Sequence, residues 1–251
     1  MGKPAGKNRE GAGLSRKERK LSNQGLIRRI GGAMLPSWDC LLCGGRDSGH
    51  LLCAGCQTDL APLPLPACPR CALPLADGHP CGACLRQPPH FDASVAAYVY
   101  GFPVDQLVQA LKYGHRLALA DFFAERLLAG PRPAGDLLLP LPLAPDRLRE
   151  RGFNQALEIA RPLARHLGLP LETALCQRRG ATTSQASLPW KERRKNVRHA
   201  FECRGDLSGV HVLVVDDVMT TGATLDEFAN TLKHHGASSV SNWVVARTLR
   251  D

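Results

Sequence analysis

The stretch Val212-Leu-Val-Val-Asp-Asp-Val-Met-Thr-Thr-Gly-Ala-Thr224 decides the fold of this chain. Its first four residues are apolar and predict a buried strand, and residues 224–235 have the apolar spacing of a helix that Gly236 ends. A strand, a glycine-containing turn and a helix in direct succession are typical of open α/β sheets, which bind ligands at the carboxyl ends of their strands. We therefore expect an α/β domain in which a parallel sheet is flanked by helices.

The acidic pair and the turn in this stretch predict a binding site for a sugar phosphate. Carboxylates at the end of a strand can accept hydrogen bonds from two sugar hydroxyls. The turn offers backbone N–H groups, threonine hydroxyls and the positive end of a helix dipole to a phosphate, and Gly222 permits close backbone approach. An acidic pair before a glycine can also be a plain strand end with a helix cap, but the complete arrangement favours a ligand site. The candidate binding residues are Asp216, Asp217, Thr220, Thr221, Gly222, Ala223 and Thr224.

The segments before and after this stretch alternate between strand and helix patterns, as βαβ units do. Segment 104–128 fits one long or two short helices, and Asn154 is a suitable N-cap for the helix that follows it. The polar, basic segment 178–199 has no apolar periodicity and predicts a mobile loop. The expected strands are 94–102, 136–143, 210–215 and 239–248, and the expected helices are 104–128, 154–167 and 224–235.

Eight of the ten cysteines form an internal repeat, in which two Cys-x-x-Cys pairs recur after a shift of 28 residues. Four thiolates complete the closed tetrahedral shell of a structural zinc site, so the repeat predicts two structural zinc ions. An iron–sulfur cluster or redox dithiols are the alternatives, and the spacing permits sequential or crossed pairing. Cys176 and Cys203 stand alone and are interpreted as small buried residues. The predicted metal ligands are Cys40, Cys43, Cys53, Cys56, Cys68, Cys71, Cys81 and Cys84.

The composition is that of an ordinary globular protein, with 44% hydrophobic and 22% charged residues, which excludes a fibrous or fully disordered chain. Nine basic and two acidic residues give residues 1–33 a charge of +7 out of the total of +9. Such a tail attracts nucleic-acid phosphates or is simply disordered. Its end, residues 26–34, has the spacing of a short amphipathic helix. With no apolar run long enough for a membrane span or a secretory signal, we expect a cytoplasmic protein.

The stretch 212–224 resembles the signature of type I phosphoribosyltransferases, and further blocks narrow the resemblance to the ComF family. This family consists of phosphoribosyltransferase-like proteins associated with bacterial competence and DNA uptake. The resemblance spans about residues 34–251, and one departure is Ala144, where family members often have His. The blocks are the cysteine repeat, Leu111-Lys-Tyr, Pro140-Leu-Pro-Leu, Arg151-Gly-Phe-Asn-Gln155, Thr183-Ser-Gln185, Arg194-Lys-Asn-Val197 and Ala200-Phe201.

Beyond the basic tail at 1–33, which is read from its composition and expected to be disordered, the resemblance implies two parts: a double zinc-ribbon-like module at 34–90 and a phosphoribosyltransferase-like domain at 91–251. It also implies a pocket for phosphoribosyl diphosphate, in which Asp216 and Asp217 hold the ribose hydroxyls and the turn holds the 5-phosphate. The diphosphate and its Mg²⁺ would lie near the loop after Leu143, with Arg149 and Arg151 as candidate charge contacts or plain surface arginines. Segment 178–199 would be a flexible hood carrying Lys191, Arg193, Arg194 and Lys195.

Two functions of different classes follow from the resemblance. The first is a phosphoribosyltransferase of unidentified acceptor that uses Mg²⁺ and phosphoribosyl diphosphate, in DNA uptake or nucleotide metabolism. The second is a non-catalytic single-stranded-DNA-binding protein of natural transformation, working with DNA-uptake proteins. The basic residues suit electrostatic contact with DNA, although an aromatic content of 5% offers few platforms for base stacking. A regulator that senses the metabolite is a third interpretation.

Overall fold

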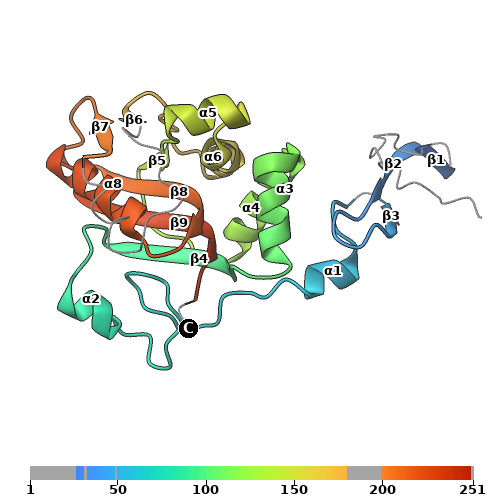
Figure 1. Ribbon diagram of the computed structural model, residues 1–251, viewed down its shortest axis with the longest axis horizontal. Helices are drawn as coiled ribbons and strands as arrows, with labels where there is room; N and C mark the ends of the chain where they lie inside the picture. Colours follow the sequence, from blue (N-terminus) through green and yellow to red (C-terminus); the bar gives the residue numbers. More distant parts are fainter. Residues whose placement is uncertain (1–26, 31–32, 49, 180–198, 250–251) are drawn as a thin grey trace, which may run out of the picture.

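A computed structural model of the chain describes residues 27–30, 33–48, 50–179 and 199–249. Its centre is a four-stranded sheet with the strand order β4-β9-β8-β5, and all three strand pairs are parallel (Figure 1). The expected α/β class with a parallel sheet is therefore confirmed. The strands are β4 (Ala93–Val99), β5 (Leu137–Pro140), β8 (His211–Met219) and β9 (Ser239–Arg247).

Alternate residues of β8 point into two separate hydrophobic cores, because side chains alternate across the faces of a sheet. Val212 and Val214 pack in the core that contains α8 (Ala223–His234). Leu213 and Val215 pack in the core on the other face, which is covered by three helices. These helices are α3 (Val104–Gly114), α4 (Ala118–Ala129) and α6 (Gln155–Leu167).

The helix boundaries follow local signals in the sequence. Segment 104–128 forms two helices rather than one, and the break comes after α3 at His115, whose φ of 52° is left-handed. The side chain of Asn154 accepts a hydrogen bond from the N–H of Ala156 and so caps α6, as expected. Gly168 ends that helix in the left-handed conformation that glycine favours. A short helix that the sequence analysis did not predict, α5 (Pro145–Arg151), begins with a proline in its first turn.

The segment before residue 60 contains a hairpin where we expected a helix. Strands β1 (Ile27–Ile30) and β2 (Ala33–Asp39) pair antiparallel, and β2 also pairs with β3 (Arg46–Ser48). The prediction of an amphipathic helix over 26–34 is therefore wrong. The Gly31-Gly32 dipeptide between β1 and β2 is a hairpin signal that outweighs the helical spacing. Two short helices, α1 (Ala54–Thr58) and α2 (Gly82–Arg86), follow within the cysteine repeat.

Cys176 and Cys203 are buried as expected, but they do not stand alone. They lie opposite each other on the antiparallel strands β6 (Cys176–Arg178) and β7 (Phe201–Cys203) and are joined by a disulfide. Local sequence patterns do not predict this pairing, because the two cysteines are 27 positions apart and meet only through the register of the two strands.

Two predicted segments lie outside the described residues: the basic tail up to residue 26, and most of the expected hood, including Lys191, Arg193, Arg194 and Lys195. Within the described ranges, no helix has both the length and the apolar character that a bilayer crossing requires.

Candidate functional site

The end of β8 and the start of α8 form the wall of a cavity of about 160 Å³. Asp216 and Asp217 line it at the carboxyl end of β8, and both are buried, with exposed fractions of 8% and 3%. Gly222 precedes α8 with a φ of 81°, and a Cβ at this position would lie 2.7 Å from Cε of Met219. The positive φ strains any larger residue here, whereas the contact with the flexible end of Met219 could be relieved by a movement of that side chain. The turn consequently brings its backbone close to the acidic pair.

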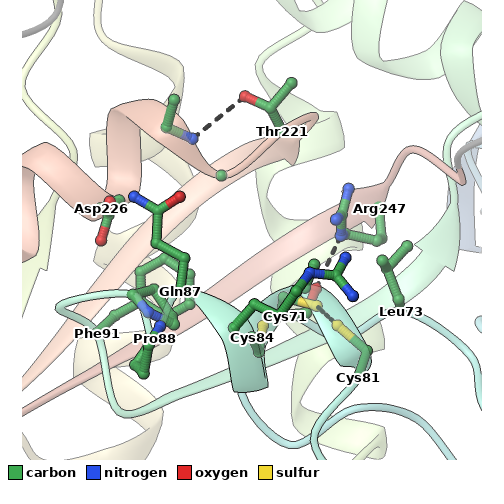
Figure 2. A pocket seen from close by; sticks show the side chains of 15 residues that line it. Cys71, Leu73, Cys81, Cys84, Gln87, Pro88, Phe91, Thr221, Asp226 and Arg247 are labelled. Atoms are coloured by element: carbon green, nitrogen blue, oxygen red, sulfur yellow. Dashed lines mark hydrogen bonds between the residues drawn. The ribbon is translucent and has the colours of Figure 1, made fainter. Parts of the chain in front are cut away.

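The turn divides its residues between two cavities. Thr220, Gly222, Ala223 and Thr224, four of the predicted binding residues, line the cavity of Asp216 and Asp217. The fifth turn residue, Thr221, lines a neighbouring cavity, and its Oγ1 accepts a hydrogen bond from the N–H of Ala223 at 3.2 Å (Figure 2). Its side chain therefore stabilises the turn and is not part of the wall that holds the two carboxylates.

Asp217 is held by side chains from two helices. Lys112 of α3 forms an ion pair with its Oδ2, and Nε2 of Gln155, at the start of α6, donates to its Oδ1 at 3.1 Å. Arg151 is itself buried; it donates from Nη1 to Oε1 of Gln155 and lies over the ring of Tyr113, 5.2 Å from the centroid. The ion pair and the hydrogen bond together fix the orientation of the buried Asp217 carboxylate. Arg151 thus acts on the site through Gln155.

Asp216 has a different electrostatic environment from that of its neighbour. Burial raises the pKa of Asp216 well above its ordinary value of 3.8, and the nearby Asp217 carboxylate raises it further. Arg178 of β6 lines the same cavity; burial lowers the pKa of its guanidinium group, while the charge of Asp216 opposes that shift. The site therefore holds one carboxyl group whose pKa burial raises and one that is paired with a lysine.

The structure does not bring Arg149 to the cavity. Its side chain is 75% exposed and pairs with Asp146 on the same helix, α5. Sequence reasoning instead missed three residues that lie at the acidic pair: Lys112, Gln155 and Arg178. Lys112 and Gln155 stand in two blocks that carry the family resemblance, Leu111-Lys-Tyr and Arg151 to Gln155. The sequence therefore marked both residues but did not indicate that they contact Asp217.

The cysteine repeat folds into two separate clusters, and the pairing is sequential. One cluster contains Cys40, Cys43, Cys53 and Cys56, and the other contains Cys68, Cys71, Cys81 and Cys84. In each cluster the four sulfurs lie within 4.8 Å of one another. The Sγ atoms of Cys43 and Cys53 are 3.7 Å apart, as are those of Cys71 and Cys81. Tetrahedral zinc with Zn–S bonds of about 2.3 Å requires sulfurs about 3.8 Å apart, so both clusters fit structural zinc.

Backbone N–H groups point at the sulfurs of both clusters. Gly45 donates to Sγ of Cys43 at 3.4 Å, and Cys81 donates to Sγ of Cys68 at 3.3 Å. Burial opposes ionisation of Cys68, but hydrogen bonds from the backbone of Cys71 and Cys81 lower its pKa to about 7. Such bonds stabilise the thiolate form that a metal requires.

Comparison with known proteins agrees with both halves of this architecture. The family model described as a double zinc ribbon domain matches residues 32–85, and that of a phosphoribosyl transferase domain matches residues 154–250. The chain is therefore a phosphoribosyltransferase-like protein with an N-terminal double zinc ribbon. A purine phosphoribosyltransferase from Pyrococcus horikoshii aligns over 54% of this chain and 84% of its own at 20% identity, but its TM-score of 0.32 is too low to carry an argument.

Three relatives identify the family. The "DNA utilization protein YhgH" of Salmonella typhimurium is 37% identical over 191 residues, covering 72% of this chain and 84% of its own. "Competence protein F" of Haemophilus influenzae is 31% identical and covers 78% and 90% of the two chains. "Competence protein ComFC" of Bacillus subtilis is 26% identical and covers 78% and 84%. This chain belongs to the ComF family.

Proposed function

We propose that the cavity between β8, α8 and β6 binds phosphoribosyl diphosphate or a nucleotide, and that the chain is a cytoplasmic phosphoribosyltransferase-like protein of DNA uptake or nucleotide metabolism. One observation carries the proposal: two buried carboxylates, Asp216 and Asp217, share a cavity with the glycine turn that begins α8. A ligand that satisfies both features has vicinal hydroxyls at one end and a phosphate at the other, as a ribose 5-phosphate has.

The two carboxyl groups suit a ribose because their surroundings differ. Asp217, paired with Lys112, accepts a hydrogen bond from one hydroxyl, while Asp216, whose pKa is raised by burial, can accept from or donate to the other. The backbone N–H of Gly222, the hydroxyls of Thr220 and Thr224 and the α8 dipole bind the phosphate. Mutual orientation of sugar and phosphate is thereby fixed from both ends.

The diphosphate end of the ligand needs positive charge. Arg178 already lines the cavity, whereas Arg149 faces solvent, so Arg178 is the better placed guanidinium group. Bound Mg²⁺ would neutralise charge on the departing diphosphate. Among the described residues that line the cavity, only Asp216 and Asp217 carry carboxyl groups, and Asp217 already pairs with Lys112, which suits a metal that is held mainly by substrate phosphates.

If the protein is catalytic, the bond between C1 of the ribose and the diphosphate breaks as an acceptor bonds to C1. The chain's part is to hold the ribose through Asp216 and Asp217 and to exclude water. No described side chain in the cavity stands out as a general base for the acceptor, so the acceptor supplies its own nucleophile in this proposal.

The printed names of the relatives support the link to DNA, since they refer to DNA utilization and competence. They also favour a second candidate function, a non-catalytic protein that binds single-stranded DNA. The charge of +7 on residues 1–33 supports this candidate, because basic segments release counterions from phosphate backbones. DNA binding of that kind weakens steeply with salt and does not need Asp216 or Asp217.

Calorimetric titration of the zinc-loaded protein with phosphoribosyl diphosphate and Mg²⁺ tests the proposal. The matched variant is the double substitution Asp216→Asn with Asp217→Asn, which keeps side-chain size and removes both carboxylates. We expect affinity to fall at least roughly tenfold, because the charge-assisted hydrogen bond to Asp217 is lost. Equal heats in both proteins would contradict the site.

Traced release of labelled diphosphate with candidate bases separates the two functions. Release that disappears in the double variant supports the enzyme. Salt-sensitive DNA binding that is unchanged in the double variant, with no diphosphate release, supports the binding protein.

A further inference from the structure

The second cysteine cluster and the phosphate-binding turn line the same cavity, which has a volume of about 290 Å³ (Figure 2). Three of the four cysteines, Cys71, Cys81 and Cys84, contribute to its wall together with the turn residues 221–223. The second zinc ribbon therefore lies directly beside the turn, although more than 130 residues of sequence separate them.

Arg247 connects the two structures. It is the last residue of β9, it is 1% exposed, and the register of the parallel sheet places it beside Met219. Its Nε donates to the carbonyl oxygen of Cys71 at 2.8 Å. Its Nη1 donates to the carbonyl of Met219 at 3.0 Å and also to that of Thr220. One rigid guanidinium group thus bonds to a metal-binding residue, as Figure 2 shows, and to the backbone that enters the turn.

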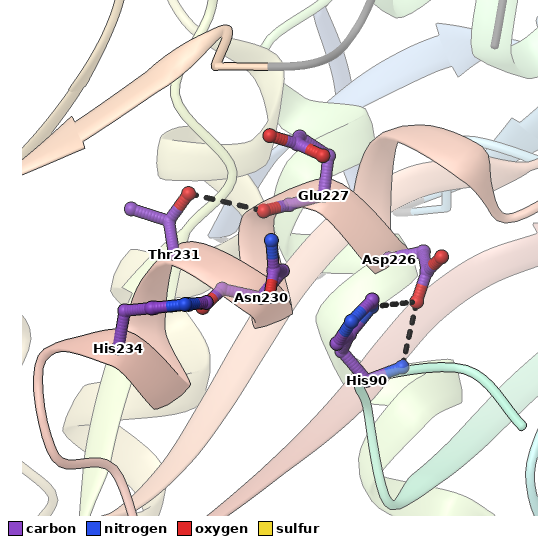
Figure 3. A network of polar contacts seen from close by, with 6 residues as sticks. All are labelled: His90, Asp226, Glu227, Asn230, Thr231 and His234. Carbon is purple, nitrogen blue, oxygen red and sulfur yellow. Dashed lines mark hydrogen bonds and ion pairs between the residues drawn. The ribbon is translucent and has the colours of Figure 1, made fainter.

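Two further contacts connect the ribbon to the start of α8. The N–H and Nδ1 of His90, which follows the second cluster, lie 2.6 and 3.0 Å from Oδ1 of Asp226 in the first turn of α8 (Figure 3). Phe91 is 2% exposed, and its ring packs against Gly222. A Cβ atom built on Gly222 would lie 3.7 Å from Cζ of that ring. The segment that follows the second ribbon therefore contacts both the turn, at Gly222, and the first turn of α8, at Asp226.

The first cluster has no comparable connection among the hydrogen bonds of the described residues. Its backbone bonds stay local: Cys40 N–H bonds to Gly45, Leu41 N–H bonds to Leu51, and the side chain of Gln57 bonds to Leu52. The two clusters, with the same ligand spacing, thus differ in whether they reach the proposed ligand site.

We propose that Arg247 is a positioning residue through which the metal state of the second cluster, and not that of the first, sets the geometry of the phosphate-binding turn. This inference rests on the proposed function for its ligand, a sugar phosphate. Loss of zinc from the second cluster releases the Cys71 segment, removes the fixed acceptor of Arg247 Nε and leaves the turn free to move away from its phosphate-binding form. Zinc in the second ribbon is then a determinant of ligand affinity.

The repeat supplies a matched pair of variants for the test. Cys71→Ser and Cys43→Ser remove the second ligand of each cluster, and each variant should retain one zinc ion where the parent holds two. Hydrogen exchange of the amides of residues 219–223 is measured in full-length, zinc-loaded protein without ligand. Affinity for ribose 5-phosphate is then measured by calorimetry.

We expect Cys71→Ser to speed exchange in the turn at least tenfold and to weaken ribose 5-phosphate binding at least tenfold. In Cys43→Ser both quantities should stay within twofold of the parent. Equal changes in the two variants, or no change in Cys71→Ser, would overturn the coupling while leaving the site assignment intact. Parent protein that fails to bind ribose 5-phosphate, with exchange still altered only in Cys71→Ser, would instead overturn the proposed function and leave the coupling standing.

Arg247→Lys keeps the test decisive if Cys71→Ser does not fold. Lysine retains the charge but lacks the fork that bonds to Cys71 and Met219 together. We expect this variant to retain both zinc ions. The amide exchange rates of residues 219–223 and the dissociation constant for ribose 5-phosphate should each increase at least fivefold. Exchange and affinity equal to those of the parent would rule out Arg247 as the connecting residue.

Discussion

The two cysteine clusters share one ligand spacing but have different surroundings. In the first, Cys43 is exposed, Cys53 and Cys56 are only partly buried, and Cys40 alone is buried, in the core of the sheet face that α3 and α4 cover. This cluster belongs to the segment that contains β2, β3 and α1 (Figure 1). In the second, all four cysteines are buried, and they belong to the same hydrophobic core as Phe228 of α8. The spacing of the cysteines determines that a metal is bound; the packing around them determines what the metal stabilises.

The largest expected effect that would sharpen this comparison is on thermal stability. Cys71→Ser should lower the free energy of unfolding of the sheet by about 3–5 kcal/mol, because a buried metal site inside the core is lost. The unfolding temperature, followed by circular dichroism, should then fall by roughly 10 °C. Cys43→Ser should shift it by less than about 2 °C, since the first cluster can unfold locally. Equal shifts would remove the distinction between the clusters.

The two clusters should lose zinc to a chelator at different rates. A chromophoric chelator reaches exposed thiolates before buried ones, so we expect two kinetic phases of equal amplitude that differ at least about tenfold in rate. Cys43→Ser should lack the fast phase and Cys71→Ser the slow one. A single phase in the parent protein would contradict the difference in burial.

Asp216 lies near the carboxyl end of β8, whose residues Val212 and Val214 pack in the same core as the second cluster. We expect substitution of Asp216 to stabilise the sheet and this core. Burial raises its pKa above 3.8, so the folded state retains a proton that the unfolded state loses, and the free energy of unfolding falls as the pH rises above that value. Asp216→Asn removes this penalty and should raise stability by about 1–2 kcal/mol at pH 7, with a smaller gain near pH 4.

Denaturant titrations at the two pH values measure this gain. The slow zinc phase should slow further in Asp216→Asn, and the fast phase should not change. A variant that is less stable than the parent at pH 7 would show that Asp216 is ionised and well paired instead.

The smallest expected effect concerns the contact between His90 and Asp226. Asp226→Ala removes both hydrogen bonds and one acidic residue from the first turn of α8, which should cost about 0.5–1 kcal/mol because the pair is partly solvent-exposed. The slow zinc phase should accelerate about twofold to fivefold. Asp105→Ala is the matched control, since it removes an acidic residue from the first turn of α3 without touching the second ribbon. Acceleration of the slow phase by Asp105→Ala as well would show a general loss of stability.

The central sheet and the acidic turn could be predicted from sequence because their signals are local. The strand before Asp216, the glycine at 222 and the cap at Asn154 each act within a few residues of their own position. The four-cysteine sets were likewise readable, although their sequential pairing needed coordinates. The division of the chain at residues 34–90 and 91–251 stays a prediction.

What could not be predicted depends on contacts between distant segments. Lys112 and Gln155 reach Asp217 only because α3 and α6 pack on the same face of the sheet. Arg247 lies beside Met219 because of the parallel register of β8 and β9, and it reaches Cys71, 176 positions away in the sequence, because the second ribbon packs against the end of β9. The disulfide between β6 and β7 depends on register in the same way. Local patterns contain no information about such registers.

Hydrogen exchange with and without phosphoribosyl diphosphate and Mg²⁺ tests the central claim most directly, since it reports on both regions in one experiment. The account predicts that the ligand slows exchange at the amides of residues 220–224, while amides of residues 40–59 around the first cluster are unchanged. Slowed exchange at the first cluster with none at the turn would contradict it.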